Sequence, residues 1–145
     1  MTEFQAALGI GQLQRFGKEL DKRRALASCY LAQLKDEALL ALPEYDEGHS
    51  WQSYMVVLGG SIDRNAIIHK LAKRGIQTNL GAQALNCLTY YQAKYGFGDG
   101  DCPNAARLYK QGLALPLYGK LDETCIVHIC KELSSCLKSL SSSTS

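Results

Sequence analysis

Hydrophobic residues recur every three or four positions along the start of the chain, the spacing that lines one side of a helix. They are Phe4, Leu8, Leu13, Phe16, Leu20, Ala27, Leu31 and Leu34. The pattern predicts one long helix over residues 3–34. Gly9, Gly11 and Gly17 interrupt it, and each costs about 1 kcal/mol relative to alanine. Close approach of another backbone is the usual reason for such glycines. We therefore expect these turns to pack against a surface, for which the chain offers no obvious partner.

Four later segments have the character of extended chain. Residues 50–58 are rich in aromatic and β-branched side chains and end at a Gly-Gly pair, which is typical of a strand. Residues 39–42 form a short apolar run that a proline stops, as in an edge strand. Residues 76–80 are a further candidate, and residues 113–117 read as extended. Together they predict a small sheet of about three strands, whose directions the pattern does not decide.

Helices are predicted between and after these segments. Ser61 or Asp63 can cap one, and a short helix is possible around residues 90–95. Pro103 suits the first position of the next helix, and Asp122 can cap the last. The sum is an α+β domain with a long N-terminal helix, a small sheet of about three strands and helices packed on it.

The bulk composition is that of a globular domain. Of the 145 residues, 46% are hydrophobic and 21% charged, and the formal net charge is +2. So small a charge gives no reason to expect nucleic acid or an anionic membrane as a partner. No apolar run reaches the ~18 residues of a membrane span, and the N-terminus has no signal-peptide pattern. We expect a cytoplasmic protein with one domain over residues 1–140 and a disordered tail over residues 141–145.

The six cysteines and three histidines are the first candidates for chemistry. Without an export signal, we expect reduced thiols that serve as small buried side chains. Cys125, His128 and Cys130 could suggest a metal site, but positions i and i+5 of a helix do not share a face. We therefore expect no metal, and we place His69 on a helix surface.

Two other features leave alternatives open. The tyrosines could form a stacking platform for a base or sugar, although half-buried packing is the commoner role. They are Tyr90, Tyr91, Tyr95, Tyr109 and Tyr118. The stretch Gly96-Phe97-Gly98-Asp99-Gly100 lacks the Lys-Ser/Thr ending of a phosphate-binding loop, so we expect a flexible loop. The residues alone therefore predict an α+β domain without a defined reaction.

A set of motifs, in a particular order, adds a family resemblance. They are Met1 to Gln12, Arg23 and Arg24 with Tyr30, His49-Ser50-Trp51-Gln52-Ser53-Tyr54, Gly75-Ile76-Gln77-Thr78, and Cys102-Pro103-Asn104-Ala105 followed by Leu113-Ala114-Leu115-Pro116-Leu117-Tyr118. Their order and spacing resemble the C-terminal small domain of the DegT/DnrJ/EryC1/StrS family. These are pyridoxal-phosphate-dependent sugar aminotransferases of fold type I.

The resemblance implies that the large and small domains of these enzymes have different roles. In such enzymes a lysine in a Ser-x-His-x-x-Lys motif of a large domain forms the Schiff base with pyridoxal phosphate. This sequence has no such motif, and Met1 resembles an internal residue of the family pattern. We therefore expect a fragment without catalytic or cofactor-binding residues, which binds no pyridoxal phosphate alone. Joined to its missing large domain, it would help to transfer an amino group, usually from glutamate, to a nucleotide-linked keto sugar.

The resemblance also gives candidate substrate contacts. Many members carry His-Tyr-x-Pro-x-His after the Gly-Ile-x-Thr turn, where this chain has Gly81, Ala82 and Asn86 at the His, Tyr and second His positions. Gln83 and Asn86 are therefore the candidates to hydrogen-bond a sugar hydroxyl or a nucleotide phosphate, with Tyr90 beside them. A loop held together by its own amides is an equally good interpretation.

Association and alternative roles complete the expectations. Without a large domain, Phe4, Leu8 and Phe16 would be exposed, so we expect the chain to form a homo-oligomer or to fray at its start. The alternative function is a stand-alone binding or assembly module that complements a separate large domain. A third hypothesis is an unrelated metal or redox protein that uses the cysteines and histidines.

Overall fold

A long helix, α1 (Glu3–Leu34), opens the fold and confirms the predicted element. The computed structural model describes residues 1–60 and 62–141. The hydroxyl of Thr2 accepts a hydrogen bond from the Gln5 backbone N–H (3.2 Å), and the Gln5 side chain accepts one from the Thr2 backbone N–H (2.9 Å). This reciprocal capping satisfies two donors that a helix start leaves free. The helix is buried only in its second half, through Leu26, Ala27, Tyr30 and Leu34.

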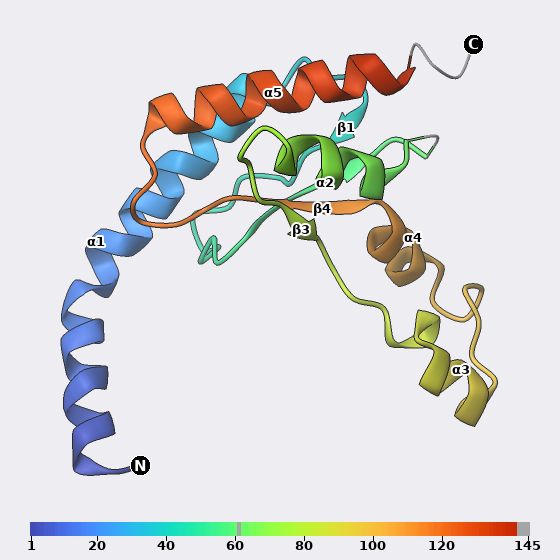
Figure 1. The fold of residues 1–145 in the computed structure, drawn as a ribbon. Helices are drawn as coiled ribbons and strands as arrows, with labels where there is room; N and C mark the ends of the chain where they lie inside the picture. Colours follow the sequence, from blue (N-terminus) through green and yellow to red (C-terminus); the bar gives the residue numbers. More distant parts are fainter. Residues whose placement is uncertain (61, 142–145) are drawn as a thin grey trace.

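The sheet has four antiparallel strands in the order β1-β2-β4-β3 (Figure 1). They are β1 (Leu40–Ala41), β2 (Tyr54–Leu58), β3 (Asn79–Leu80) and β4 (Gly112–Leu115). Each strand lies within one of the four segments predicted to be extended, apart from Gly112 at the start of β4, so the sheet has one strand more than the predicted total of about three. The strand expected over residues 50–58 begins later, at Tyr54. Trp51 has a φ of 47°, which interrupts the extended backbone before the strand starts.

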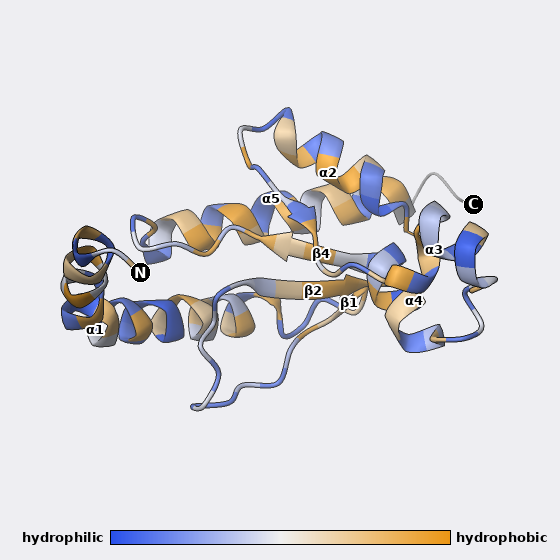
Figure 2. Cartoon of the chain, turned by 90° about the horizontal axis from the view of Figure 1, so that it is seen from below, coloured by the Kyte–Doolittle hydropathy of each residue, from blue (hydrophilic) through white to orange (hydrophobic). Residues whose placement is uncertain are grey.

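Helices cover one face of this sheet. α2 (Arg64–Ala72) and α5 (Glu123–Ser141) pack together, and α5 also packs on the second half of α1. Tyr54, Val56 and Leu58 of β2 point into this core and are 0–1% exposed, whereas Met55 and Val57 on the other side are half-buried. Seen from below, β2 and β4 lie between the two long helices with no helix drawn over them (Figure 2). The sheet therefore keeps one face open.

Short polar side chains fix where the covering helices begin. Asp63 caps α2 by accepting hydrogen bonds from backbone N–H groups two and three positions later (2.8 and 3.2 Å). Ser61, the other predicted cap, lies outside the described residues. Asp122 caps α5 as predicted, accepting from the Cys125 N–H at 2.8 Å. Ser141 ends α5 instead of opening a disordered tail, and the rest of the predicted tail is outside the described residues. None of the described helices is both long and apolar enough to cross a bilayer.

A second group of helices projects away from the sheet (Figure 1). It consists of the 3₁₀ turn η1 (Leu85–Cys87), α3 (Thr89–Tyr95) and α4 (Pro103–Gln111). α3 and α4 confirm the predicted helices, with Pro103 at the first helical position. Only a short loop separates β3 from η1, so the projecting group is connected directly to an edge strand of the sheet.

A run of three basic residues ties α1 to the loops beside it. Lys22, Arg23 and Arg24 all donate to main-chain carbonyl groups of other segments. Lys22 bonds to Gly119; Arg23 bonds to Trp51 and Gln52 at 3.1 Å each; and Arg24 bonds to Glu47 at 2.6 Å. Each bond has a charged donor, which makes it stronger than a neutral one. We call residues 22–24 the basic clamp.

Candidate functional site

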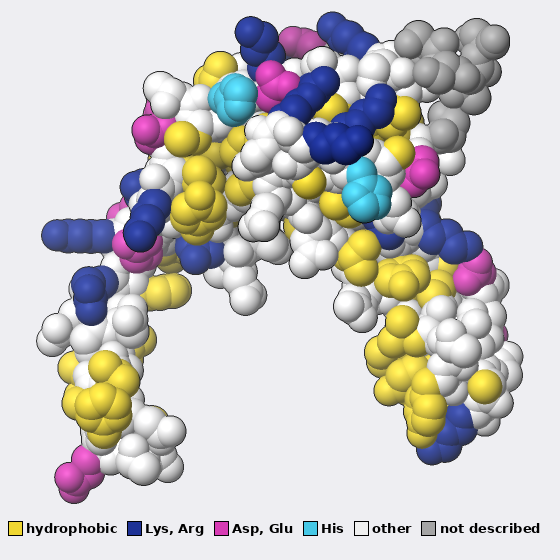
Figure 3. All heavy atoms as spheres, viewed as in Figure 1, with side chains coloured by type: hydrophobic (Ala, Val, Ile, Leu, Met, Phe, Trp, Pro, Cys, Tyr) yellow, Lys and Arg dark blue, Asp and Glu magenta, His cyan; other side chains and the backbone are white. Residues whose placement is uncertain are grey.

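Two projections and the open sheet face between them enclose a hollow (Figure 3). One projection is the first part of α1, residues 3–20, which we call the free half of α1. The other holds η1, α3 and the loop to α4, residues 85–101, which we call the α3 segment. Together with the half-buried side chains of Met55 and Val57, they form a concave surface that we call the arch.

The exposed apolar residues gather on these two projections. Among the described residues, thirteen large hydrophobic side chains are exposed, and six of them lie in residues 1–16 and four in residues 85–97. They are Met1, Phe4, Leu8, Ile10, Leu13 and Phe16 on the first, and Leu85, Tyr90, Tyr95 and Phe97 on the second. Monomeric proteins seldom expose apolar patches of this extent unless the patches bind something. The arch is therefore the candidate interface of the molecule.

The expected exposure of Phe4, Leu8 and Phe16 is confirmed, at 73%, 56% and 55%. The glycines of α1 are as open as these side chains. A Cβ added to Gly9, Gly11 or Gly17 would meet no atom within 4 Å. No described backbone of this chain therefore approaches these glycines closely, and no contact within the domain requires a glycine at these positions.

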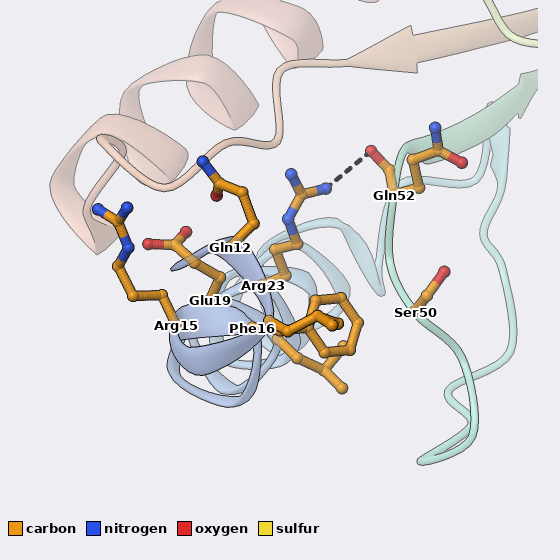
Figure 4. Close-up of a pocket in the computed structure, with 9 residues that line it drawn as sticks. Gln12, Arg15, Phe16, Glu19, Arg23, Ser50 and Gln52 are labelled. Carbon is orange, nitrogen blue, oxygen red and sulfur yellow. Dashed lines mark hydrogen bonds between the residues drawn. The ribbon is translucent and has the colours of Figure 1, made fainter. Parts of the chain in front are cut away.

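A cleft lies where the free half of α1 joins the body of the domain (Figure 4). It has a volume of about 590 Å³, and Leu13, Phe16 and Leu20 give it an apolar wall. Ser50 and Gln52 line the cleft from the loop before β2. The Arg23 guanidinium bridges the two sides through its bonds to the loop carbonyls (3.1 Å). The cleft can take an apolar side chain of another segment, with polar groups at its rim.

The three predicted substrate contacts differ in their surroundings. Asn86 is 6% exposed, and its side-chain N–H donates to the Gly98 carbonyl at 3.0 Å. This bond fits the alternative interpretation, a loop held by its own amides. Gln83 is exposed in the loop after β3, and Tyr90 is 60% exposed on α3. Gln83 and Tyr90 thus remain exposed, although the Tyr90 hydroxyl accepts a hydrogen bond from Lys94, whereas Asn86 is buried against its partner Gly98.

The tyrosine cluster is divided by the fold. Tyr91 stacks on Tyr95 (ring centroids 6.0 Å apart), and Tyr95 stacks on Phe97 (5.7 Å). Lys94 donates to the Tyr90 hydroxyl at 2.9 Å and lies 5.3 Å from the centre of that ring. Tyr109 belongs to α4 and Tyr118 to the loop before α5, so neither joins this group. The α3 segment therefore carries a compact aromatic surface. The sequence alone did not show which of the tyrosines come together.

Charged groups fix the Gly-rich loop to the body of the protein. Asp99 forms an ion pair with Lys110 and accepts a hydrogen bond from the Cys87 thiol (3.3 Å). The bonds from Lys110 and then Cys87 hold the pKa of Asp99 below its usual value, and the same ion pair raises the pKa of Lys110. Asp101 accepts from the Gly98 N–H at 2.7 Å. The loop predicted to be flexible is thus anchored at several points.

The cysteines are less uniformly buried than predicted. Cys130 and Cys136 are buried, whereas Cys102 is exposed at the start of α4, and none of the six thiols forms a disulfide. Burial, with a smaller effect of Cys29, raises the pKa of Cys130 to about 12. Over residues 1–60 and 62–141, no three or more His, Cys, Asp or Glu side chains come together as metal ligands would. His69 is on a helix surface as expected.

The fold and the arch define a small α+β domain with an open docking face. The sequence pattern of the DegT/DnrJ/EryC1/StrS aminotransferase family matches residues 1–134. The chain belongs to this family, and the resemblance inferred from its motifs is confirmed.

Known relatives agree with this assignment. The spore coat polysaccharide biosynthesis protein SpsC of Bacillus subtilis is 30% identical over 129 residues, which are 85% of this chain and 33% of SpsC. The putative sugar aminotransferase Spr1654 of Streptococcus pneumoniae, in its PMP form, is 26% identical with a TM-score of 0.89, over 99% of this chain and 37% of that one. Helicobacter pylori PseC, an aminotransferase of pseudoaminic acid biosynthesis, shares the fold (TM-score 0.87, 22% identity, 96% of this chain and 38% of PseC). The chain therefore spans about a third of the length of these relatives.

Proposed function

We propose that this chain is the small domain of a pyridoxal-phosphate-dependent aminotransferase that acts on a nucleotide-linked keto sugar, with glutamate as the amino donor. The arch carries the proposal, because its apolar projections are exposed while the core behind it is complete. The relatives are about three times as long as this chain. We therefore propose that the large domain of the complete enzyme occupies the arch. The relatives named for sugar amination and polysaccharide synthesis support the substrate class.

Two lysines of this chain, Lys94 and Lys110, do not fit the role of a Schiff-base residue. Such a lysine must reach a neutral amine form, which burial or a neighbouring cation favours. Hydrogen bonds to Tyr90 and Tyr95 instead raise the pKa of Lys94, and the Asp99 ion pair raises that of Lys110. Since the chain also lacks the Ser-x-His-x-x-Lys motif of the family, we assign the cofactor to the large domain. Spr1654 has been solved in PLP and PMP forms, which supports a pyridoxal cofactor for the complete enzyme.

Within that enzyme, the arch would cover one side of the active site. Gln83 and Tyr90 offer an amide and a hydroxyl at the edge of the α3 segment, and both are exposed. These groups suit the hydroxyl and phosphate oxygens of a nucleotide sugar. Asn86 would act beside them by holding the loop through its bond to Gly98. In the assembled enzyme, Gln83 and Tyr90 would orient the sugar.

A chimera tests this function. The segment of Spr1654 that aligns with this chain would be replaced by the chain, and the product assayed for a glutamate half-reaction and for amination of a keto sugar. We expect turnover, and we expect Phe16→Glu in the cleft to abolish it by blocking docking, while the variant domain stays folded because Phe16 is 55% exposed. A folded chimera that holds cofactor but is unaffected by Phe16→Glu would contradict docking through the cleft.

A second experiment separates the fragment from the alternative of a stand-alone module. The purified chain would be titrated with pyridoxal phosphate and reduced with borohydride, and the lysines examined by mass spectrometry. We expect no stoichiometric adduct at any single lysine. Adding the large domain as a separate polypeptide would restore activity only if the chain acts as a complementing module. A specific adduct on the chain alone would contradict the assignment of the cofactor to the large domain.

A further inference from the structure

Two cysteines stand at the ends of the projection that carries α3. Cys87 is the last residue of η1 and is half-buried, and Cys102 directly precedes the first residue of α4 and is exposed. Both thiols are free. Residues 88–101 lie between them and include α3 with its stacked aromatic rings. A bond between the two sulfurs would therefore close this side of the arch into a ring.

Hydrogen bonds hold the two ends of this projection together. The Asn86 side chain donates to the Gly98 carbonyl at 3.0 Å. The Cys87 thiol donates to the next residue along, the Asp99 carboxylate, at 3.3 Å. The Gly98 carbonyl also accepts from the Asp101 backbone N–H at 3.2 Å, which closes a turn directly before the second cysteine. The end of η1 and the start of α4 are thus joined by contacts that pass through this one turn.

The surroundings of the two thiols give them different reactivities. Partial loss of contact with water, and then the hydrogen bond to Asp99, raise the pKa of Cys87. Smaller effects come from Lys110, which lowers this pKa, and from Cys102, which raises it, so both groups lie within electrostatic reach of Cys87. Cys87 is therefore a protonated thiol at neutral pH. The exposed Cys102 sulfur is the one that a dissolved reagent meets first, because reaction at a thiol requires access to it.

We propose that Cys87 and Cys102 form an oxidation site, at which a peroxide converts the two thiols into a disulfide. The Cys102 sulfur attacks the peroxide, the O–O bond breaks, and a sulfenic acid and one water form. The Cys87 sulfur then attacks the sulfur of the sulfenic acid and displaces hydroxide, which leaves with the Cys87 proton as a second water. Gly100 has open space where a Cβ would stand, so the backbone before Cys102 is free to adjust while the S–S bond forms.

The site makes one side of the arch responsive to oxidants. Tyr90 and the stacked rings lie inside the ring that the disulfide closes, so oxidation fixes their surface against α4. Disulfides of this kind in a reducing compartment are usually transient and redox-sensing. The bond forms within this chain, so the inference does not depend on the proposed function.

Peptide mapping of the full chain tests the site. The folded protein would be treated with hydrogen peroxide, its remaining thiols blocked, and the product digested with trypsin without reductant. Trypsin cuts between the two cysteines after Lys94, the only lysine or arginine in residues 88–101. We expect the peptide of residues 75–94 to be linked to that of residues 95–107, at the sum of their masses less two hydrogen atoms. Added reductant should separate the two peptides.

A matched pair of variants checks which cysteines take part. Cys102→Ser should abolish the linked peptide and leave Cys87 as a thiol, whereas Cys125→Ser, at a half-buried cysteine of α5, should leave the linkage unchanged. Circular dichroism would confirm that both variants are folded. The proposal is overturned if the unmodified chain links a different pair, if Cys102 joins two copies of the chain, or if Cys102 is oxidised to a sulfinic acid while Cys87 remains a thiol.

Discussion

Two stacked tyrosines in the core provide a direct test of how this domain is held together. Tyr30 and Tyr54 are both 0% exposed, and their ring centroids lie 4.6 Å apart. The Tyr30 hydroxyl donates to the Pro116 carbonyl at 2.8 Å. The Tyr54 hydroxyl is buried without a hydrogen-bond partner among the described residues. The same substitution, tyrosine to phenylalanine, should therefore have different effects at the two positions.

The magnitudes follow from the hydrogen bonds. Tyr30→Phe loses a net contribution of about 1 kcal/mol and leaves the Pro116 carbonyl short of a donor, so we expect the free energy of unfolding to fall by about 1–2 kcal/mol. Tyr54→Phe removes an unsatisfied hydroxyl whose burial costs about 1–3 kcal/mol, so we expect the free energy of unfolding to stay the same or to rise by up to about 1 kcal/mol. For a domain of this size, 1 kcal/mol corresponds to roughly 2–4 °C in Tm.

Urea unfolding followed by the fluorescence of Trp51 would measure both variants. Trp51 is the single tryptophan and is 1% exposed, and it stacks on Tyr54 at 5.8 Å, so it reports on this core. Equal m-values would show that the comparison concerns the folded state. If Tyr54→Phe destabilised the domain as much as Tyr30→Phe, the Tyr54 hydroxyl would have a partner and the reasoning would be refuted.

Three further predictions concern helices and thiols. Gly17→Ala should stabilise the isolated chain by about 0.5–1 kcal/mol in urea unfolding. Gly112→Ala should destabilise it, because the added Cβ would clash with the backbone carbonyl of Leu108 in α4. Equal effects of the two substitutions would contradict the described packing. Cys102 should react with a thiol reagent in the folded protein and Cys130 only after unfolding, since burial raises the pKa of Cys130 to about 12; peptide mapping would detect early labelling of Cys130. Hydrogen bonds from the first turn of α5 lower the pKa of Asp122 to about 2, so its contribution to stability is complete above about pH 4 and is lost as the pH falls towards 2. Asp122→Asn should make thermal stability less dependent on pH in that range, and an unchanged slope would count against this cause.

The helices were predictable because their signals are local. Asp63 and Pro103 mark helix starts through groups that lie within one turn, so sequence alone identifies them. The strands were harder, since pairing between distant segments defines them. β3 exists because Asn79 and Leu80 meet β4 more than 30 positions later. The left-handed backbone of Trp51, which shortens β2, has no signature in the sequence.

The candidate site was only partly predictable for a similar reason. The exposed apolar start of α1 followed from its composition and from the lack of a partner in the chain. The structural role of Asn86 was only one of two interpretations, because its partner Gly98 belongs to a loop that was expected to be flexible. The aromatic surface of the α3 segment also depends on how Tyr91, Tyr95 and Phe97 stack in space. Contacts between side chains from different turns and loops determine these features.

The basic clamp has a consequence for how this domain can diversify. Its bonds end on main-chain carbonyl groups at positions 47, 51, 52 and 119. A carbonyl is present whatever the residue, so the side chains at these positions can change without loss of the bonds. Ser50 and Gln52, which line the cleft, belong to one of the clamped loops. Substitutions can therefore change the surface that contacts a partner, while Lys22, Arg23 and Arg24 keep the loops in place.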